Sequence, residues 1–532
     1  MDQPPTEVAR RTRKCHTRSR SGCFTCRKRR VRCDGNQPYC LRCTNAGRLC
    51  EFRAPTLPLR DRRPKAQTLP GQQQPWAAES AQFQVVWSGP LATKLMDPFG
   101  SFAINMPFKS RELLHYFHQA AHTSNGSLEV KENDILASLA QHPNALRNTL
   151  LIAGLHYAWK VGGLQTYELT FLFHKIETIR LLNDWMKDSQ SDDLMAIVQH
   201  IATLCFTECS LGNIPAAETH LDGLVTVVDL HRPLNHEFDG RMEVNDELVN
   251  RYLILSWHSV HVLKSRVEGS KSLRKMFGPT KTTQFSKMIS LLHQWRSQDI
   301  GSFEALLKII RLLPYFGGLP TKKAFHPIDG LPMIECLRVL TTSTTSAKLD
   351  CGNDDPCPIW ADGSASRLTL ELMKSHISSL DDDRDVIFGS LVCLPTSWCG
   401  ISITSGLYLH SVLELCNGGN PIDARLFRYL ILMLMRDLRR EIHETDARGL
   451  SDFWFWKAFV GAFSLAKRQL YEYNETLEGI QYAFNGYIQG WRDNSNVTQW
   501  TEAKNRLLRI AWTADVPLAD TVWETAVRYE TM

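Results

Sequence analysis

Residues 23–50 read CFTCRKRRVRCDGNQPYCLRCTNAGRLC, and the rest of the chain is best interpreted outward from them. The cysteine spacing is C-x2-C-x6-C-x6-C-x2-C-x6-C, so one C-x2-C-x6-C unit occurs twice. The six cysteines are Cys23, Cys26, Cys33, Cys40, Cys43 and Cys50. Between the second and third of them lies RKRRVR, in which all residues but the valine are cationic. Thiols that surround a cluster of positive charge predict a small metal-folded module that contacts nucleic acid.

A disulfide framework is the alternative for a cysteine-rich stretch, and it requires an oxidising, secreted setting. The first residues, MDQPPTEVARRTRK, contain no apolar run of the kind a signal peptide needs, and no window is apolar enough for a membrane helix. We therefore expect a reduced, soluble, intracellular protein that has no membrane partner. In that setting a C-x2-C pair indicates a metal site or a redox site, and a redox pair would leave four of the six cysteines unexplained.

The number of cysteines constrains the metal. Zn²⁺ prefers four ligands in a tetrahedron, so six thiolates are too many for one ion and too few for two separate sites. Two zinc ions that share two thiolates fit the count. Because so small a module buries little apolar surface, the metal must supply most of its folding free energy, on the order of 10 kcal/mol per structural zinc.

With its basic run, Asp34 and Pro38, this stretch resembles the fungal Zn2Cys6 binuclear cluster family. The resemblance implies that Cys23 and Cys40 bridge the two ions. Cys26 and Cys33 would complete one site, and Cys43 and Cys50 the other. It also implies a short helix after each C-x2-C pair, with Pro38 in the loop between the halves.

In that family, the basic residues before the third cysteine read a CGG triplet in the major groove of DNA. The matching positions here are Arg29 and Arg30. An arginine fork can bond O6 and N7 of guanine together. The remaining cations of the module are predicted phosphate contacts, and they are Arg27, Lys28, Arg32, Arg42 and Arg48.

Charge is distributed unevenly along the chain. Residues 1–65 hold 18 of the 61 Lys and Arg residues but only 5 of the 56 acidic residues. Residues 1–22 are a basic, disordered tail that suits nuclear import or phosphate contact. Residues 51–110 are a Pro- and Gln-rich linker with a second basic patch at residues 60–65. No heptad pattern occurs between residues 51 and 110, so the oligomeric state stays open between a monomer and a dimer formed through the large domain.

Residues 111–532 show apolar residues at helical spacing throughout and no alternating strands of consequence. We therefore predict a mainly α chain: a Zn2Cys6 domain, a disordered linker and a large all-α domain. Residues 191–231 resemble part of the regulatory domain of fungal zinc-cluster factors, which implies a regulatory role. Asn144 is expected to cap a helix over residues 145–160, another helix is expected over residues 366–392, and the stretch 316–363 is expected to be irregular.

Several features of the large domain could suggest chemistry, but packing explains each of them more simply. Cys205 and Cys209 lie on an apolar helix face, where core packing is expected. Two further cysteine pairs, Cys351 with Cys357 and Cys393 with Cys399, flank loops, and a redox-sensor role is not the favoured interpretation of either pair. The histidine pairs His115/His118 and His258/His261 have no accompanying HExxH motif, and the aromatic run at residues 453–456 fits a core. No nucleophile-elbow, Walker or dinucleotide-binding pattern occurs, so an enzyme is not expected.

Together these features predict a nuclear, sequence-specific DNA-binding regulator of RNA polymerase II transcription. Its expected partners are double-stranded DNA with CGG-containing sites and the transcription machinery or co-regulators. Zinc is expected to be structural, with two ions. The alternative is an adaptor or ligand-sensing regulator with only general affinity for nucleic acid.

Overall fold

The computed structural model describes residues 22–29, 31–52, 102–122, 142–187, 194–231, 243–269, 300–320, 324–350, 364–380, 393–415, 421–444, 451–472 and 474–528. The chain divides into two compact units, Met1–Trp87 and Ser88–Met532, which we call the cluster unit and the helical body. Most of the predicted basic tail, residues 1–22, and of the predicted linker, residues 51–110, lies outside the described residues, which include only residue 22 of the tail and residues 51–52 and 102–110 of the linker. The prediction of a mainly α chain with a small metal module is confirmed.

The cluster unit contains two very short helices, α1 (Phe24–Lys28) and α2 (Leu41–Thr44). Both begin between the two cysteines of a C-x2-C pair, not after the pair as predicted from the resemblance. The reason is local. The sulfur atoms of Cys23 and Cys40 accept hydrogen bonds from the backbone amides of Cys26 and Cys43, so the first cysteine of each pair is the N-cap.

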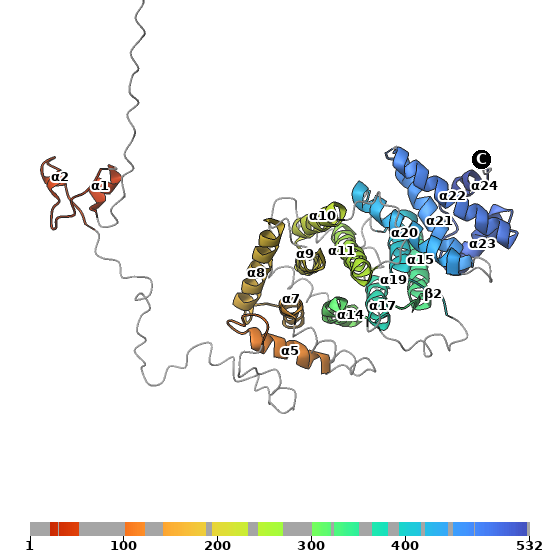
Figure 1. The fold of residues 1–532 in the computed structure, drawn as a ribbon, viewed down its shortest axis with the longest axis horizontal. Coiled ribbons are helices and arrows are strands. Elements are labelled where there is room, and N and C mark those ends of the chain that lie inside the picture. The colour runs from red at the N-terminus through yellow and green to blue at the C-terminus, as the bar shows by residue number, and fades with distance from the viewer. Residues whose placement is uncertain are drawn as a thin grey trace, which may run out of the picture. The chain divides into compact units, whose positions relative to one another are not determined.

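The first half of the helical body is built from long helices joined by short connections or by stretches outside the described residues (Figure 1). They are α5 (Ser110–His122), α7 (Pro143–Val161), α8 (Glu168–Lys187), α9 (Leu194–Ser210), α10 (Ile214–His231), α11 (Val244–Gly269), α14 (Ile300–Leu312) and the 3-10 turn η2 (Leu313–Gly317).

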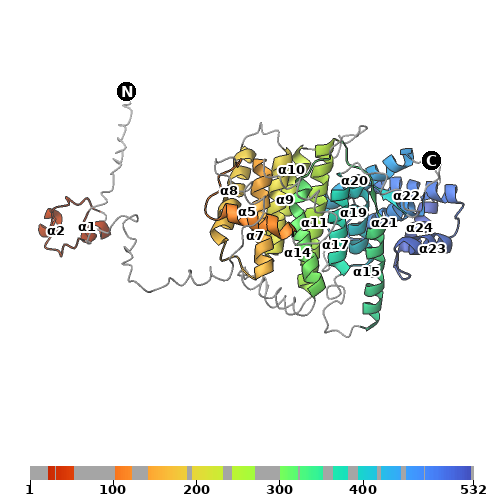
Figure 2. The same cartoon turned by 90° about the horizontal axis from the view of Figure 1, so that it is seen from below.

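The second half continues in the same manner. Its elements are α15 (Leu331–Asp350), α17 (Ser364–Ser378), α19 (Trp398–Leu407), the π-helical turn η3 (Tyr408–Val412), α20 (Ala424–Glu444), α21 (Asp452–Gln469), α22 (Glu475–Ser495), α23 (Trp500–Ile510) and α24 (Ala519–Arg528). Within this unit the chain runs broadly from one end, where α5, α7 and α8 lie, to the other end, where α22, α23 and α24 lie (Figure 2).

Three local predictions for the body were wrong. The stretch 316–363, expected to be irregular, contains the twenty-residue helix α15. The Asp329 carboxylate accepts hydrogen bonds from the amides of Leu331 and Leu394, which caps α15 and ties it to the strand pair β1 (Ile328–Asp329) and β2 (Pro395–Thr396). Pro332 lies in the first turn of α15, where a proline is compatible with a helix.

The other two errors concern helix ends. Helix α17 ends at Ser378, well before residue 392, and the chain has turned into β2 by Pro395. Helix α7 begins at Pro143 with His142 as N-cap, so Asn144 lies inside the helix and does not cap it. Pro143 fits the first position because its missing amide hydrogen would have had no helical partner there.

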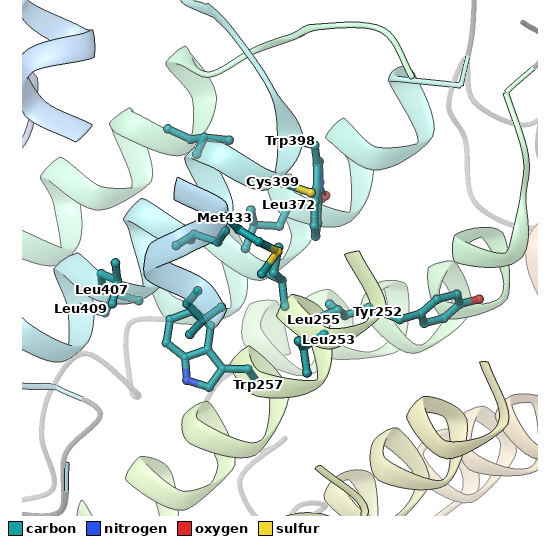
Figure 3. Packing of buried hydrophobic residues seen from close by; sticks show 14 of the residues in the cluster. Tyr252, Leu253, Leu255, Trp257, Leu372, Trp398, Cys399, Leu407, Leu409 and Met433 are labelled. Carbon is teal, nitrogen blue, oxygen red and sulfur yellow. Dashed lines mark hydrogen bonds between the residues drawn. The ribbon is translucent and has the colours of Figure 1, made fainter. Parts of the chain in front are cut away.

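The core of the body is centred on α19, in which all ten residues are buried. This helix packs against α11, α17, α20 and α21, as Figure 3 shows for Trp257, Leu372 and Trp398. Gly406 permits the close approach of α11, because a Cβ there would lie 2.4 Å from the ring of Trp257. The aromatic run at residues 453–456 is buried in α21, as predicted, and Phe455 stacks on Trp491 at 3.7 Å.

A buried ionic cluster, which the sequence did not reveal, joins α21 to α20 and β2. The Lys457 side chain is completely buried, and its Nζ donates to Asp437 at 3.0 Å, Glu441 at 2.6 Å and Thr396 at 3.1 Å. Burial lowers the pKa of Lys457, but the two carboxylates outweigh it and hold that pKa above its usual value. For Asp437, burial is outweighed by Lys457 and Arg440, and the pKa is lowered. The pair is therefore ionised and satisfied inside the fold.

Candidate metal centre and nucleic-acid interface

Four sulfur atoms meet at the centre of the cluster unit. The Sγ atom of Cys23 lies 3.6 Å from that of Cys40 and 3.7 Å from that of Cys43. The Sγ atom of Cys26 lies 3.7 Å from that of Cys40 and 3.8 Å from that of Cys43. Two thiolates on one tetrahedral zinc are about 3.8 Å apart, since Zn–S is about 2.3 Å. The spacing of the sulfur donors therefore fits zinc.

The two halves of the module repeat the same contacts seventeen residues apart. The amide of Cys23 donates to the sulfur of Cys33 at 3.4 Å, and the amide of Cys40 donates to the sulfur of Cys50 at 3.2 Å. Cys26 donates in the same way to Cys23, as does Cys43 to Cys40. The duplicated sequence thus folds into two equivalent halves, and backbone amides fix the sulfur positions.

Each half of the module also donates one backbone amide hydrogen bond to the other half. The amide of Phe24 donates to the carbonyl oxygen of Glu51 at 2.7 Å, and the amide of Leu41 donates to the carboxylate of Asp34 at 3.0 Å. Phe24 and Leu41 follow the first cysteine of their halves, and Asp34 and Glu51 follow the third. Each half therefore secures the helix start of the other. The hydrogen bond from Leu41 lowers the pKa of Asp34.

The two remaining cysteines, Cys33 and Cys50, lie beside the four central sulfur atoms. Cys50 is buried and Cys33 is half-buried, and a donor atom of Cys33 lies within 4.8 Å of donors of Asp34 and Cys40. Burial and hydrogen bonds with neighbouring sulfurs raise the pKa of Cys43 to about 12, and they also raise that of Cys26. A bound divalent cation reverses this effect, because thiols that coordinate a metal are deprotonated.

The basic residues lie at and beyond the end of α1. Arg27 and Lys28 form its last turn, Arg29 is its C-cap, and all three side chains are exposed, as is Arg32. Arg42 and Arg48 are exposed in the second half. Arg30, one of the two predicted base contacts, lies outside the described residues. The described basic residues in and directly after α1 are therefore all exposed to solvent.

Within the described residues of the body, the other candidates behave as packing groups. Cys205 and Cys209 are buried in α9, and His258 donates from Nε2 to the carbonyl oxygen of Ser402. Cys399 is buried in α19, Cys393 is half-buried, and Cys351 and Cys357 lie outside the described residues. The groups of side chains placed to hold a metal all belong to the cluster unit, as far as the described chain extends. A search of the described helices found none long and apolar enough to cross a membrane.

Comparison with known proteins agrees with this site. Residues 21–58 match the fungal Zn(2)-Cys(6) binuclear cluster domain. The chain is 44% identical over 52 residues to "Transcription factor lfc1" of Flammulina velutipes. It is 40% identical over 77 residues to "Aspercryptin biosynthesis cluster-specific transcription regulator atnN" of Emericella nidulans, and 50% identical over 40 residues to "Transcriptional regulatory protein pro1" of Neurospora crassa.

These similarities are confined to a small part of each protein. They cover 10%, 14% and 8% of this chain, and 18%, 12% and 6% of the respective relatives. No solved structure matches the chain. The family match at residues 21–58 includes the six cysteines and the basic run. Residues 21–58 therefore match a fungal Zn(2)-Cys(6) binuclear cluster domain, and the relatives that share similarity with this chain are named as transcription factors or transcriptional regulators.

Proposed function

We propose that the protein is a nuclear, sequence-specific DNA-binding regulator of RNA polymerase II transcription. The observation that carries this proposal is the row of exposed cations at the end of α1, a helix whose start is fixed by a sulfur donor of the metal centre. Holding the cations on a metal-fixed helix orients them as one surface, which a flexible basic tail could not do.

The centre takes two zinc ions in this proposal, with Cys23 and Cys40 as shared ligands. Their sulfur atoms are 3.6 Å apart, and each is the N-cap of one of the two equivalent helices. Cys26 and Cys33 then complete one site, and Cys43 and Cys50 the other. The repeated amide-to-sulfur hydrogen bonds support this equal division of ligands between the halves.

In this proposal the basic residues of the module make two kinds of contact with DNA. Arg29 and Arg30 read guanines of a CGG triplet in the major groove, because each arginine can form a bidentate contact with a guanine edge. The other cations of the module contact phosphate and set the position of the helix, and they are Arg27, Lys28, Arg32, Arg42 and Arg48. The helical body controls transcriptional output through contacts with the transcription machinery or co-regulators.

Selection of bound sites from random DNA tests the proposal. We expect enrichment of CGG-containing sites, and Arg29→Ala and Arg30→Ala should each cost about 1–3 kcal/mol of binding to such a site while relaxing base preference. Arg48→Ala is the matched control, because loss of a phosphate contact weakens binding to every sequence about equally. If the selection enriches no sequence, the protein is an adaptor with general nucleic-acid affinity.

A further inference from the structure

Helix α8 carries apolar residues on two faces. Its inner face packs against α7 and α9 at one end of the helical body (Figure 1). The buried residues of that face are Thr170, Phe171, His174, Thr178 and Leu182. These residues provide the contact with the described core, and the apolar residues on the opposite face retain large exposed fractions.

The opposite face is exposed and regularly spaced. Its apolar side chains retain large exposed fractions: Leu169 67%, Leu172 43%, Ile176 62%, Ile179 39% and Met186 66%. The steps between these positions are three, four, three and seven residues. Asn183, which is also exposed, occupies the position that divides the last step into four and three. We call these six residues the outer seam.

A spacing of alternating three and four residues is the a/d pattern of a heptad repeat. Leu169, Ile176 and Asn183 are then the a positions, and Leu172, Ile179 and Met186 are the d positions. At a rise of 1.5 Å per residue, the outer seam is about 26 Å long. A helix of a monomer normally directs polar side chains to solvent, and a continuous exposed apolar stripe marks an interaction site.

Asn183 indicates what occupies the seam. An amide at an a position is satisfied when the partner helix presents an amide at the same level, and it then fixes register and strand number. A second copy of α8, parallel and in register, places Asn183 against Asn183 and pairs leucine, isoleucine and methionine with their equals. An unrelated, wholly apolar helix would leave the amide unpaired in the interface.

The charges beside the seam are compatible with this pairing. Parallel pairing brings Lys175 of one copy toward Arg180 of the other, and two cations would repel. Each is already next to a carboxylate of its own chain, Lys175 with Glu208 and Arg180 with Glu177 at 3.8 Å. The repulsion across the interface is therefore reduced by charges that are in place before the copies meet.

We propose that the protein forms a homodimer through the outer seam of α8, with the two helices parallel and Asn183 paired with its equivalent. This inference does not depend on the proposed DNA recognition, which concerns the other unit.

The test is the mass in solution of the full, zinc-loaded chain, measured by light scattering over a range of concentrations. We expect a concentration-dependent dimer. Ile176→Glu should convert it to a monomer with unchanged helical content, because Ile176 is mostly exposed and glutamate is a good helix former. Leu230→Glu is the matched control on α10, where Leu230 is 75% exposed and lies outside the seam, and it should leave the dimer intact. A wild-type monomer throughout, or a dimer that survives Ile176→Glu, overturns the proposal.

A mixing experiment tests the orientation. Differently tagged wild-type and Asn183→Leu chains should each pair with themselves and form the mixed dimer less readily, because asparagine would then face leucine. In an antiparallel pair Asn183 already faces Leu172, so ready formation of the mixed dimer overturns the parallel arrangement. The affinity of the Ile176→Glu monomer for a single DNA site should equal that of the wild type, which separates a failure of this proposal from a failure of DNA recognition.

Discussion

The two units of this chain are stabilised by different means. The cluster unit has a core of sulfur atoms and two helices of five and four residues, which could not persist in water on their own. The helical body has a continuous core of leucine, tryptophan and phenylalanine side chains. Their helix caps differ accordingly, because the cluster helices begin at cysteine sulfurs, whereas α19 and α21 begin at the hydroxyls of Ser397 and Ser451. A short chain segment thus depends on a ligand for its fold, and a long one depends on buried area.

Removal of zinc should have the largest effect on folding, and it should unfold the cluster unit without affecting the helical body. A chelator should unfold the cluster unit, since each structural zinc supplies on the order of 10 kcal/mol. Tryptophan emission from the body should not change, because residues 23–50 contain no tryptophan and 12 of the 14 tryptophans lie in the body, the other two being Trp76 and Trp87. DNA binding and emission are measured on the same sample. A change in emission on chelation would contradict independent stabilisation.

The variant Cys40→Ser distinguishes the metal-ligating role of Cys40 from its role as a helix cap. Serine is a good N-cap, so this change preserves the cap of α2 but removes a thiolate. We expect loss of zinc binding and of DNA binding, as with the chelator. If the variant keeps both, capping and not metal ligation is the main role of Cys40.

Lys457→Met should have the next largest effect, and only in the body. It removes the buried cation that Asp437 and Glu441 share and leaves only Arg440 beside Asp437, which should cost about 3–5 kcal/mol of unfolding free energy. Urea unfolding followed by tryptophan emission measures this loss. Lys187→Met is the control, because the Lys187 side chain is 79% exposed and 3.9 Å from Asp184 at the surface. Both variants should bind the same number of zinc ions as the wild type. A loss of zinc in Lys457→Met would contradict the independent stabilisation of the two units.

Mild acid should have a smaller, graded effect on the body. Burial lowers the pKa of His156 and His200 to about 3 and that of His174 and His258 to about 4. Because these pKa values lie below the unfolded value, the unfolded state binds more protons. Stability is therefore full above about pH 6.5 and falls as the pH decreases toward the folded values, by about 1.4 kcal/mol per unit for each histidine.

The measurement is urea unfolding of the body between pH 7.5 and 5, again followed by tryptophan emission. His200→Gln should lower the slope against pH by the contribution of one histidine. An unchanged slope in that variant would mean that His200 is protonated in the folded protein.

Much of the metal site could be predicted from the sequence, because its ligands lie within 28 consecutive residues and their spacing alone restricts the geometry. The meeting of Cys23, Cys26, Cys40 and Cys43 follows from two C-x2-C pairs that face a common metal centre. The exchanged contact between Asp34 and Leu41 could not be predicted, because it depends on how the two halves fold against each other.

The body was predictable to the level of its helices, since a period of 3.6 residues in apolar side chains is a local signal. The start of α15 depends on a distant contact, because the Asp329 carboxylate that accepts from the amide of Leu331 also accepts from the amide of Leu394, 65 positions along the chain. The contacts of Lys457 join residues 16 to 61 positions apart, and no local pattern indicates which charges will be buried together.

The sequence by itself therefore determined the cysteine spacing of the metal-binding module, the helical class of the body and the basic run between the cysteines, because spacing and periodicity encode each of them locally. Only the tertiary structure decided which faces of the helices are covered. The heptad on α8 looks like core in the sequence, since Leu169, Ile176 and Ile179 are ordinary core residues. It is the packing of Phe171 and Leu182 on the inner face that leaves the outer seam in solvent.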